Sequence, residues 1–125
     1  MKETDNWKTP KWLMQVFNNF FDPCPMDFNQ PPHYPKDCLH QDWPQNCYVN
    51  PPYSNPLPFV LKAIEQHKKS GGVIILLLKL DTTTKWFKAL ADAGAHFLFF
   101  AERLHYSDKD SAPFPSVLAI LSDAK

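Results

Sequence analysis

Glycine is scarce in this sequence. Only three of its 125 residues are glycine, namely Gly71, Gly72 and Gly94, whereas average usage is about 7%. Neither the G-x-G-x-x-G loop of dinucleotide-binding domains nor the G-x-x-x-x-G-K-[ST] loop that cradles phosphates can be formed with these three residues. The two commonest glycine-built nucleotide sites are therefore excluded, so a cofactor site in this chain must be built from other residues.

Net charge and long apolar runs are lacking as well. The 13 Lys and Arg residues balance 13 Asp and Glu residues, so no overall charge draws the chain toward nucleic acid or a membrane. The N-terminus has no apolar signal segment, and the longest apolar run, residues 73–78, is too short to span a bilayer. The three cysteines include no C-x-x-C pair, and we expect a reduced, cytoplasmic protein.

The sequence also lacks a recognisable set of metal ligands. His33, Cys38, His40 and Cys47 follow one another at spacings of five, two and seven residues. These spacings do not match the paired ligands of zinc sites. We therefore expect no metal.

Proline, by contrast, is abundant. Eleven of the 13 prolines lie at or before Pro58, which predicts turns and short elements in the first half of the chain and regular structure in the second. Thr9 and Pro10 are expected to cap and to open the first helix. Hydrophobic periodicity predicts helices over about residues 10–19, 59–69 and 85–93, and strands over residues 20–22, 47–49, 73–78, 96–100 and 117–121. This order predicts a single α/β domain over residues 1–125, with a small sheet between helices.

The turn Asn50-Pro51-Pro52-Tyr53 directly follows a predicted strand, and ligands of α/β proteins gather at the carboxyl ends of strands. The Asn50 carboxamide oxygen and the Pro51 carbonyl are two acceptors for one exocyclic NH2 group. Together they would direct its lone pair toward an electrophile and stabilise the positive charge that develops on nitrogen. Tyr53 offers an aromatic face on which a planar base could stack. The bland alternative is a proline-rich turn that merely ends a strand.

This turn resembles motif IV of the DNA methyltransferases that act on amino groups, and nearly the whole chain resembles the phage-type DNA N6-adenine methyltransferases (the phage Dam family). The residues that carry this resemblance are 5–10, 21–25, 37–39 with Trp43, 48–54, 77–80, 81–87 and 102–104. The order of these short segments matters more than any one of them except the turn. Cys38 departs from the family pattern, which favours glycine at this position.

The resemblance implies a small Rossmann-like methyltransferase fold, S-adenosylmethionine as methyl donor and the N6 amine of a DNA adenine as acceptor. It implies that the catalytic residues are Asn50, Pro51, Pro52 and Tyr53. It implies that the cofactor-binding residues are Trp7, Thr9, Pro10, Asp22, Pro23, Cys24, Asp37 and Asn50. Within this set Thr9 and Pro10 would lie beside the methionine moiety, and Asp37 would bind a ribose hydroxyl or the adenine amine.

The DNA contacts are less clear from the sequence. An adenine amine inside a duplex is out of reach of a pocket, so the base must be flipped out. Phosphates could bind to lysines at positions 62, 68, 69, 85 and 88, although such a run is more often a solvated helix face. Because the chain is short, we also expect that a homodimer could complete the DNA cleft.

Two alternatives remain open. The same N-P-P-Y turn serves methylation of other amines and amides, including glutamine side chains and other nucleobases. A degenerate methyltransferase fold that acts only as a DNA-binding module is the second alternative, and it would not bind the cofactor.

Overall fold

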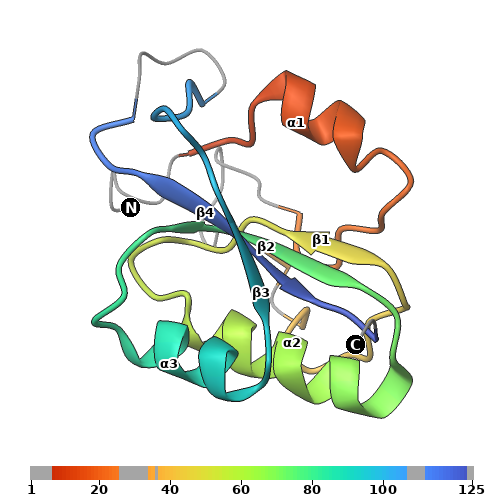
Figure 1. Cartoon of the computed structure of the whole chain (residues 1–125). Coiled ribbons are helices and arrows are strands. Elements are labelled where there is room, and N and C mark those ends of the chain that lie inside the picture. Colours follow the sequence, from red (N-terminus) through yellow and green to blue (C-terminus); the bar gives the residue numbers. More distant parts are fainter. Residues whose placement is uncertain (1–6, 26–33, 36, 107–111, 124–125) are drawn as a thin grey trace.

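The computed structural model describes residues 7–25, 34–35, 37–106 and 112–123, and these build one open four-stranded sheet with helices on both faces (Figure 1). The strands are β1 (Cys47–Val49), β2 (Ile74–Lys79), β3 (His96–Phe99) and β4 (Ser116–Leu121), in the order β1-β2-β4-β3. β1 is parallel to β2, whereas β4 is antiparallel to both β2 and β3. β1, β2 and β3 therefore point the same way, and their carboxyl ends lie at one edge of the sheet.

The helices divide between the two faces of this sheet. α1 (Lys11–Val16) lies over one face, and α2 (Leu57–Ser70) and α3 (Lys85–Asp92) lie over the other (Figure 1). α2 begins after Pro56 and ends before Gly71, where the sequence predicts its end. Thr84 is the N-cap residue of α3, and its hydroxyl accepts a hydrogen bond of 3.2 Å from the backbone N–H of Phe87. This capping bond satisfies one of the free donors of the first turn.

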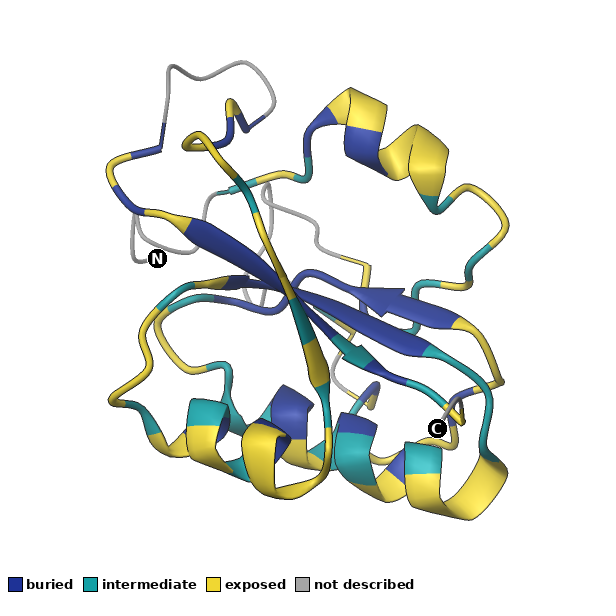
Figure 2. Cartoon of the chain, viewed as in Figure 1, coloured by how far each residue is buried: buried dark blue, intermediate teal, exposed yellow. Residues whose placement is uncertain are grey.

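β2 explains why the core has two sides. All its residues except Lys79 are buried (Figure 2), as expected for a strand covered on both faces. Ile74, Leu76 and Leu78 pack toward α2 and α3. Ile75 and Leu77 pack on the opposite side, in the cluster that contains Leu13, Tyr48, Leu104, Tyr106 and Phe114.

The α/β prediction is confirmed, and a single domain over residues 1–125 stays a prediction.

Three local predictions were wrong in detail. The strand expected over residues 20–22 is a single bridge between Phe21 and Cys47, because Pro23 has no N–H with which to continue a ladder. The first helix ends at Val16, before the asparagines that follow it. Pro10 occupies its cap position without a side-chain capping bond, and the hydroxyl of Thr9 bonds elsewhere. In the part of the chain that the structure describes, no helix is long and apolar enough to cross a membrane.

Two glycines with nearly the same backbone angle differ in their surroundings. Gly72 has a φ of +79°, and an added Cβ would lie 2.9 Å from the Cβ of Gln45. Gly94 has a φ of +80°, with nothing within 4 Å of an added Cβ. We predict that Gly94→Ala lowers the free energy of unfolding by about 1 kcal/mol through backbone strain alone, and that Gly72→Ala lowers it by about 2–3 kcal/mol because a steric clash is added.

Urea unfolding of both variants beside the wild type measures this difference. Equal losses in the two variants would contradict the close packing of Gly72 against Gln45.

Candidate functional site

The N-P-P-Y turn leaves the carboxyl end of β1, and Asn50 is held there by the N-terminal segment. Asn50 is buried, with 8% of its surface exposed. Its Nδ2 donates hydrogen bonds to the Trp7 carbonyl (2.7 Å) and to Thr9 Oγ1 (3.2 Å). A backbone carbonyl can only accept, so the bond to Trp7 fixes which end of the carboxamide is the NH2 group. Oδ1 is thereby the atom that can accept a hydrogen bond from a ligand.

Tyr48 completes this arrangement from within β1. Its hydroxyl lies 2.9 Å from Thr9 Oγ1. Burial raises the pKa of Tyr48 far above its ordinary value, and the bond to Thr9 only partly offsets this. The phenol therefore stays neutral and keeps its proton for the hydrogen bond. The structure thus brings Trp7 and Thr9, two predicted cofactor residues, onto the predicted catalytic amide. Pro10 follows them, buried, and its carbonyl accepts the first backbone bonds of α1.

Tyr53 is held by residues that the sequence analysis did not identify. Its hydroxyl lies 2.9 Å from the hydroxyl of Tyr106, which lies 2.7 Å from Ser116 Oγ in β4. The ring of Tyr53 packs edge-on against Phe114, with centroids 5.6 Å apart and planes at 81°. Trp7 packs against the other side of this cluster, 5.1 Å from Phe114 at 82°. Burial raises the pKa of Tyr53 well above its ordinary value, so this aromatic cluster is uncharged at neutral pH.

A hollow opens beside Tyr53 at the carboxyl end of β2. Its volume is about 120 Å³, and it is lined by Tyr53, Pro56, Leu78, Lys79, Asp81, Thr84 and Trp86. Aromatic rings and hydrogen-bonding groups therefore meet in one small cavity next to the turn. This combination suits a planar polar group such as a nucleobase.

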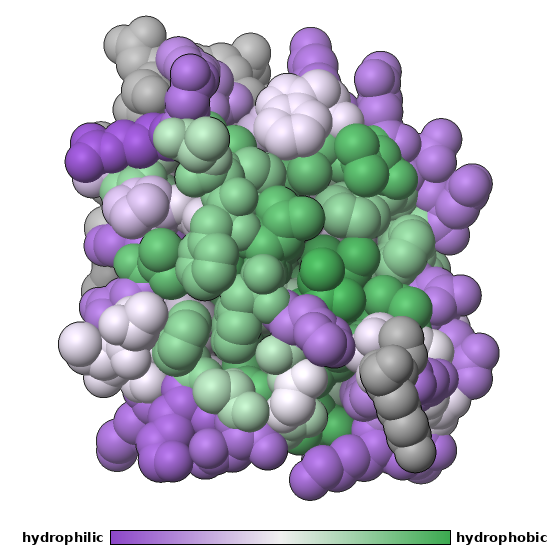
Figure 3. All heavy atoms as spheres, in the orientation of Figure 1, coloured by the Kyte–Doolittle hydropathy of each residue, from purple (hydrophilic) through white to green (hydrophobic). Residues whose placement is uncertain are grey.

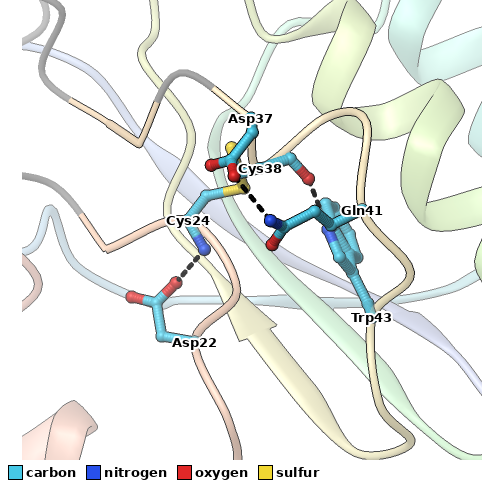
Figure 4. The surroundings of a disulfide bond; sticks show 6 residues. All are labelled: Asp22, Cys24, Asp37, Cys38, Gln41 and Trp43. Atoms are coloured by element: carbon cyan, nitrogen blue, oxygen red, sulfur yellow. Dashed lines mark hydrogen bonds between the residues drawn. A yellow bond between two sulfur atoms is a disulfide. The ribbon is translucent and has the colours of Figure 1, made fainter.

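The predicted cofactor loop lies at the other side of β1. The segment at Phe21 runs beside β1, and Asp22 follows it with Oδ1 accepting a hydrogen bond of 2.9 Å from the N–H of Cys24 (Figure 4). Burial raises the pKa of Asp22 from 3.8 to about 6, although the bond from Cys24 acts in the opposite direction. Burial, reinforced by the nearby charge of Asp22, raises the pKa of the Cys47 thiol to about 11. Asp22 is thus a poorly solvated carboxylate close to β1.

A disulfide bond joins this loop to the second predicted cofactor segment. Cys24 and Cys38 are bonded, with their Cα atoms 5.5 Å apart and a sequence separation of 14 (Figure 4). Both are almost completely buried. The carbonyl of Cys38 accepts a bond of 2.8 Å from the indole of Trp43. The expectation of reduced cysteines is therefore wrong for this pair; Cys47 remains a free, buried thiol.

The disulfide brings the segments of Asp22 and Asp37 together. Asp37 is exposed, and its carboxylate accepts a hydrogen bond from Gln41 (Figure 4). Pro23 lies between Asp22 and Cys24 and is partly buried. The cofactor roles of these residues stay predictions, because the structure shows their placement and no ligand contact.

Other candidate residues lie away from the turn. His33 lies outside the described residues, and within the described ranges no three metal-binding side chains gather. The lysines that could bind phosphate lie on α2 and α3, where Lys62, Lys69 and Lys88 form ion pairs with Glu65, Asp42 and Asp92. These pairs favour the solvated helix face over a DNA contact.

Comparisons with known proteins agree with the motifs. A family model described as DNA N-6-adenine-methyltransferase (Dam) matches residues 1–112. The chain is similar to the DNA N-6-adenine-methyltransferase of Haemophilus phage HP1 (strain HP1c1), with 38% identity over 96 residues, covering 68% of this chain and 56% of that protein. It is also similar to the DNA N-6-adenine-methyltransferase of Escherichia phage T1, with 40% identity over 65 residues, covering 50% of this chain and 27% of that protein.

The chain therefore spans about half the length of the first of these relatives and about a quarter of the second. No solved structure matches the chain.

The disulfide gives a testable stability prediction. Cross-linking a loop of about 15 residues contributes about 3 kcal/mol by restricting the unfolded chain. We expect Cys24→Ser to lower the free energy of unfolding by about this amount, measured by urea unfolding. Dithiothreitol should lower the stability of the wild type and leave Cys24→Ser unchanged.

Cys24→Ser/Cys38→Ser serves as the matched control. Its free energy of unfolding should be nearly equal to that of the single variant, because both lack the same disulfide bond. If dithiothreitol does not change the unfolding curve of the wild type, the disulfide bond does not stabilise the fold.

The raised pKa of Asp22 predicts a pH dependence. Between about pH 4 and pH 6 the folded state retains a proton that the unfolded state has lost, so this group makes the protein less stable as the pH rises. Asp22→Asn keeps the acceptor for Cys24 and removes the charge. It should unfold with a free energy higher than that of the wild type by up to about 3 kcal/mol at pH 7, and the gain should vanish near pH 4.

Asp81→Asn is the control, because hydrogen bonds from Thr83 lower the pKa of this exposed carboxyl. It should bring no gain at pH 7. An equal gain in both variants would show that the effect is general charge repulsion and not the burial of Asp22.

Proposed function

Because this chain belongs to the DNA N-6-adenine-methyltransferase (Dam) family, we propose that it transfers the methyl group of S-adenosylmethionine to the N6 amine of adenine in DNA. The single observation that best supports this function is the fixed orientation of the Asn50 carboxamide. Its NH2 end is held by the Trp7 carbonyl and Thr9, so its oxygen is presented to an incoming donor. An exocyclic amine is such a donor.

The turn supplies the chemistry that the amine needs. The adenine nitrogen is a weak nucleophile because its lone pair is conjugated with the ring. Asn50 Oδ1 and the Pro51 carbonyl would each accept a hydrogen bond from the NH2 group. These two bonds would hold the nitrogen in line for attack and stabilise the positive charge that appears on it. Pro52 restricts the backbone of the turn. S-adenosylmethionine, when bound, supplies a methyl group on a sulfonium sulfur, and transfer requires no metal.

The residues near β1 fit this cofactor. Asp22 is a partly buried carboxylate whose charge is poorly solvated, so it would gain from the donors of a ribose or an ammonium group. Asp37 lies across the disulfide from it and is exposed to receive a second donor. The residues that would hold the cofactor are Trp7, Thr9, Pro10, Asp22, Pro23, Cys24 and Asp37, together with Asn50.

Tyr53 would stack on the flipped adenine. The hydroxyl contact with Tyr106 and the edge-on contact with Phe114 fix its ring, so a base meets a face that is already oriented. The hollow of about 120 Å³ beside Tyr53 has the scale of one heterocycle. The carboxyl ends of three parallel strands meet at this edge, which supports the Rossmann-like methyltransferase fold that the resemblance implies.

DNA as substrate also supports the expected cytoplasmic location, which is the host cytoplasm if the chain is viral, because bacterial DNA lies there. The homodimer stays a prediction, and analytical ultracentrifugation of the chain with and without DNA tests it. Family membership favours a DNA adenine over a glutamine amide, and the intact Asn50 arrangement favours an enzyme over a degenerate binding module.

Replacement of Asn50 tests the proposal. Asn50→Ala removes one of the two acceptors, and loss of one such group typically costs a factor of about 10²–10³ in kcat. The assay follows a tritiated methyl group from S-adenosylmethionine into DNA and identifies N6-methyladenine in the digest by mass spectrometry. Calorimetry with S-adenosylmethionine should show a much smaller loss of affinity than of transfer rate, because Asn50 is one of eight residues that would hold the cofactor.

Asn55→Ala is the matched control, because Asn55 is an exposed asparagine five residues further along the same loop. It should keep full activity. Wild-type activity in Asn50→Ala, or transfer of label to protein and not to DNA, would overturn the assignment.

A further inference from the structure

A second and larger hollow lies at the same edge of the sheet, on the β3 side. It has a volume of about 510 Å³ and is lined by Trp12 and by residues 100–105. Trp12 comes from α1, and residues 100–105 leave the carboxyl end of β3. We call it the Trp12 groove. Because β3 is parallel to β1 and β2, the groove opens at the edge that carries Asn50 and the hollow beside Tyr53.

Both walls of the groove are tied to the proposed site by the residues next to them. Trp12 stands three residues after Thr9, which bonds to Asn50. On the other wall, His105 directly precedes Tyr106, whose hydroxyl contacts Tyr53. Leu104 is buried in the cluster that contains Tyr106 and Phe114 and anchors this wall. The groove therefore continues the proposed site at a fixed position.

The groove presents aromatic faces to solvent. Trp12 is 52% exposed, although it contacts the ring of Phe100 edge-on, with centroids 6.3 Å apart and planes at 80°. Figure 3 shows that apolar side chains gather around the edge strand β3 beside it. About half of the Trp12 side chain is therefore open to solvent, and every nucleobase can stack on an exposed aromatic ring.

One permanently charged cation, Arg103, lines the same groove beside one acid, Glu102. Arg103 is the only arginine of the sequence, is exposed and forms no salt bridge with any described residue. His105 also lines the groove and is exposed, and Lys11 stands directly before Trp12 on the chain without lining it. The planar guanidinium group suits a phosphate. An exposed arginine beside an exposed indole suits a nucleic-acid strand, because its phosphates pair with the guanidinium group and its bases stack on the ring.

We propose that the Trp12 groove binds the DNA strand next to the target adenine, with one unstacked base on Trp12 and one phosphate on Arg103. The choice of DNA rests on the proposed function. The acceptor strand then crosses the edge of the sheet from the hollow beside Tyr53 to the groove, while the cofactor segments with Asp22 lie on the β1 side of Asn50. Donor and acceptor thus approach the amide from opposite directions.

The test measures the affinity of the full chain for a fluorescent single-stranded oligonucleotide by anisotropy at several KCl concentrations. Arg103→Gln should weaken binding at low salt and reduce the slope of log K against log[KCl] by about 0.7, the value for one phosphate contact on a single strand. Trp12→Ala should weaken binding by about 5- to 100-fold and leave this slope unchanged. These two signatures separate a phosphate contact from a stacking contact.

Two matched variants serve as controls. Phe99→Ala removes an aromatic ring that is 59% exposed but stacks on Phe97 and does not line the groove. Lys88→Gln removes an exposed cation on α3, which covers the other face of the sheet from α1. Both should bind the oligonucleotide with wild-type affinity. All four variants should bind S-adenosylmethionine as the wild type does, which also shows that they are folded.

If both groove variants keep the wild-type affinity and slope, the Trp12 groove does not bind DNA. Methyl transfer to DNA by the same wild-type protein would then leave the proposed function intact. A wild type that transfers no methyl group to DNA, but loses oligonucleotide affinity in both variants, would instead overturn the function and support the groove.

Discussion

The hydrogen bond from the buried Asn50 carboxamide to the Trp7 carbonyl is the contact on which the rest of the site depends. It joins two segments 43 residues apart, and it fixes the direction of an amide that would otherwise be free to turn over. Removing the partner of a buried donor costs more than the bond contributes. The N-terminal segment must therefore stay on the end of β1, and both Trp12 and the aromatic cluster around Phe114 are positioned as a consequence.

Because β1, β2 and β3 point the same way, the proposed binding surfaces lie next to one another along one edge of the sheet. The connections through α2 and α3 return the chain between β1, β2 and β3, so these three strands all end at the same side, and β4 lies antiparallel between β2 and β3. The loop of Asp22 meets this edge beside β1, the hollow beside Tyr53 follows β2, and Arg103 follows β3. A donor and a polyanionic acceptor strand need separate binding surfaces around one nitrogen atom. Three parallel carboxyl ends place such surfaces side by side on one sheet.

Sequence analysis predicted the features that depend on local pattern. The buried strand β2, the end of α2 before Gly71 and the turn at Asn50 all follow from neighbouring residues. It did not predict the pairing of Cys24 with Cys38 or the chain of hydroxyl groups from Tyr53 through Tyr106 to Ser116, because these contacts join segments far apart in the chain. Thr9 shows the same limit: its position favours a helix cap, yet its hydroxyl bonds to Asn50 and Tyr48.

The scarcity of glycine and the abundance of proline acquire a chemical meaning at the turn. A glycine loop binds phosphates because its backbone N–H groups point at the ligand. Pro51 and Pro52 have no N–H, so this stretch of backbone offers carbonyl oxygens and no competing donors. An amine with two hydrogens requires such acceptors, and a phosphate would find nothing to bind there. In the proposed function the proline turn thus favours a hydrogen-bond donor over an anion as its ligand, and the Asn50 oxygen adds one more acceptor.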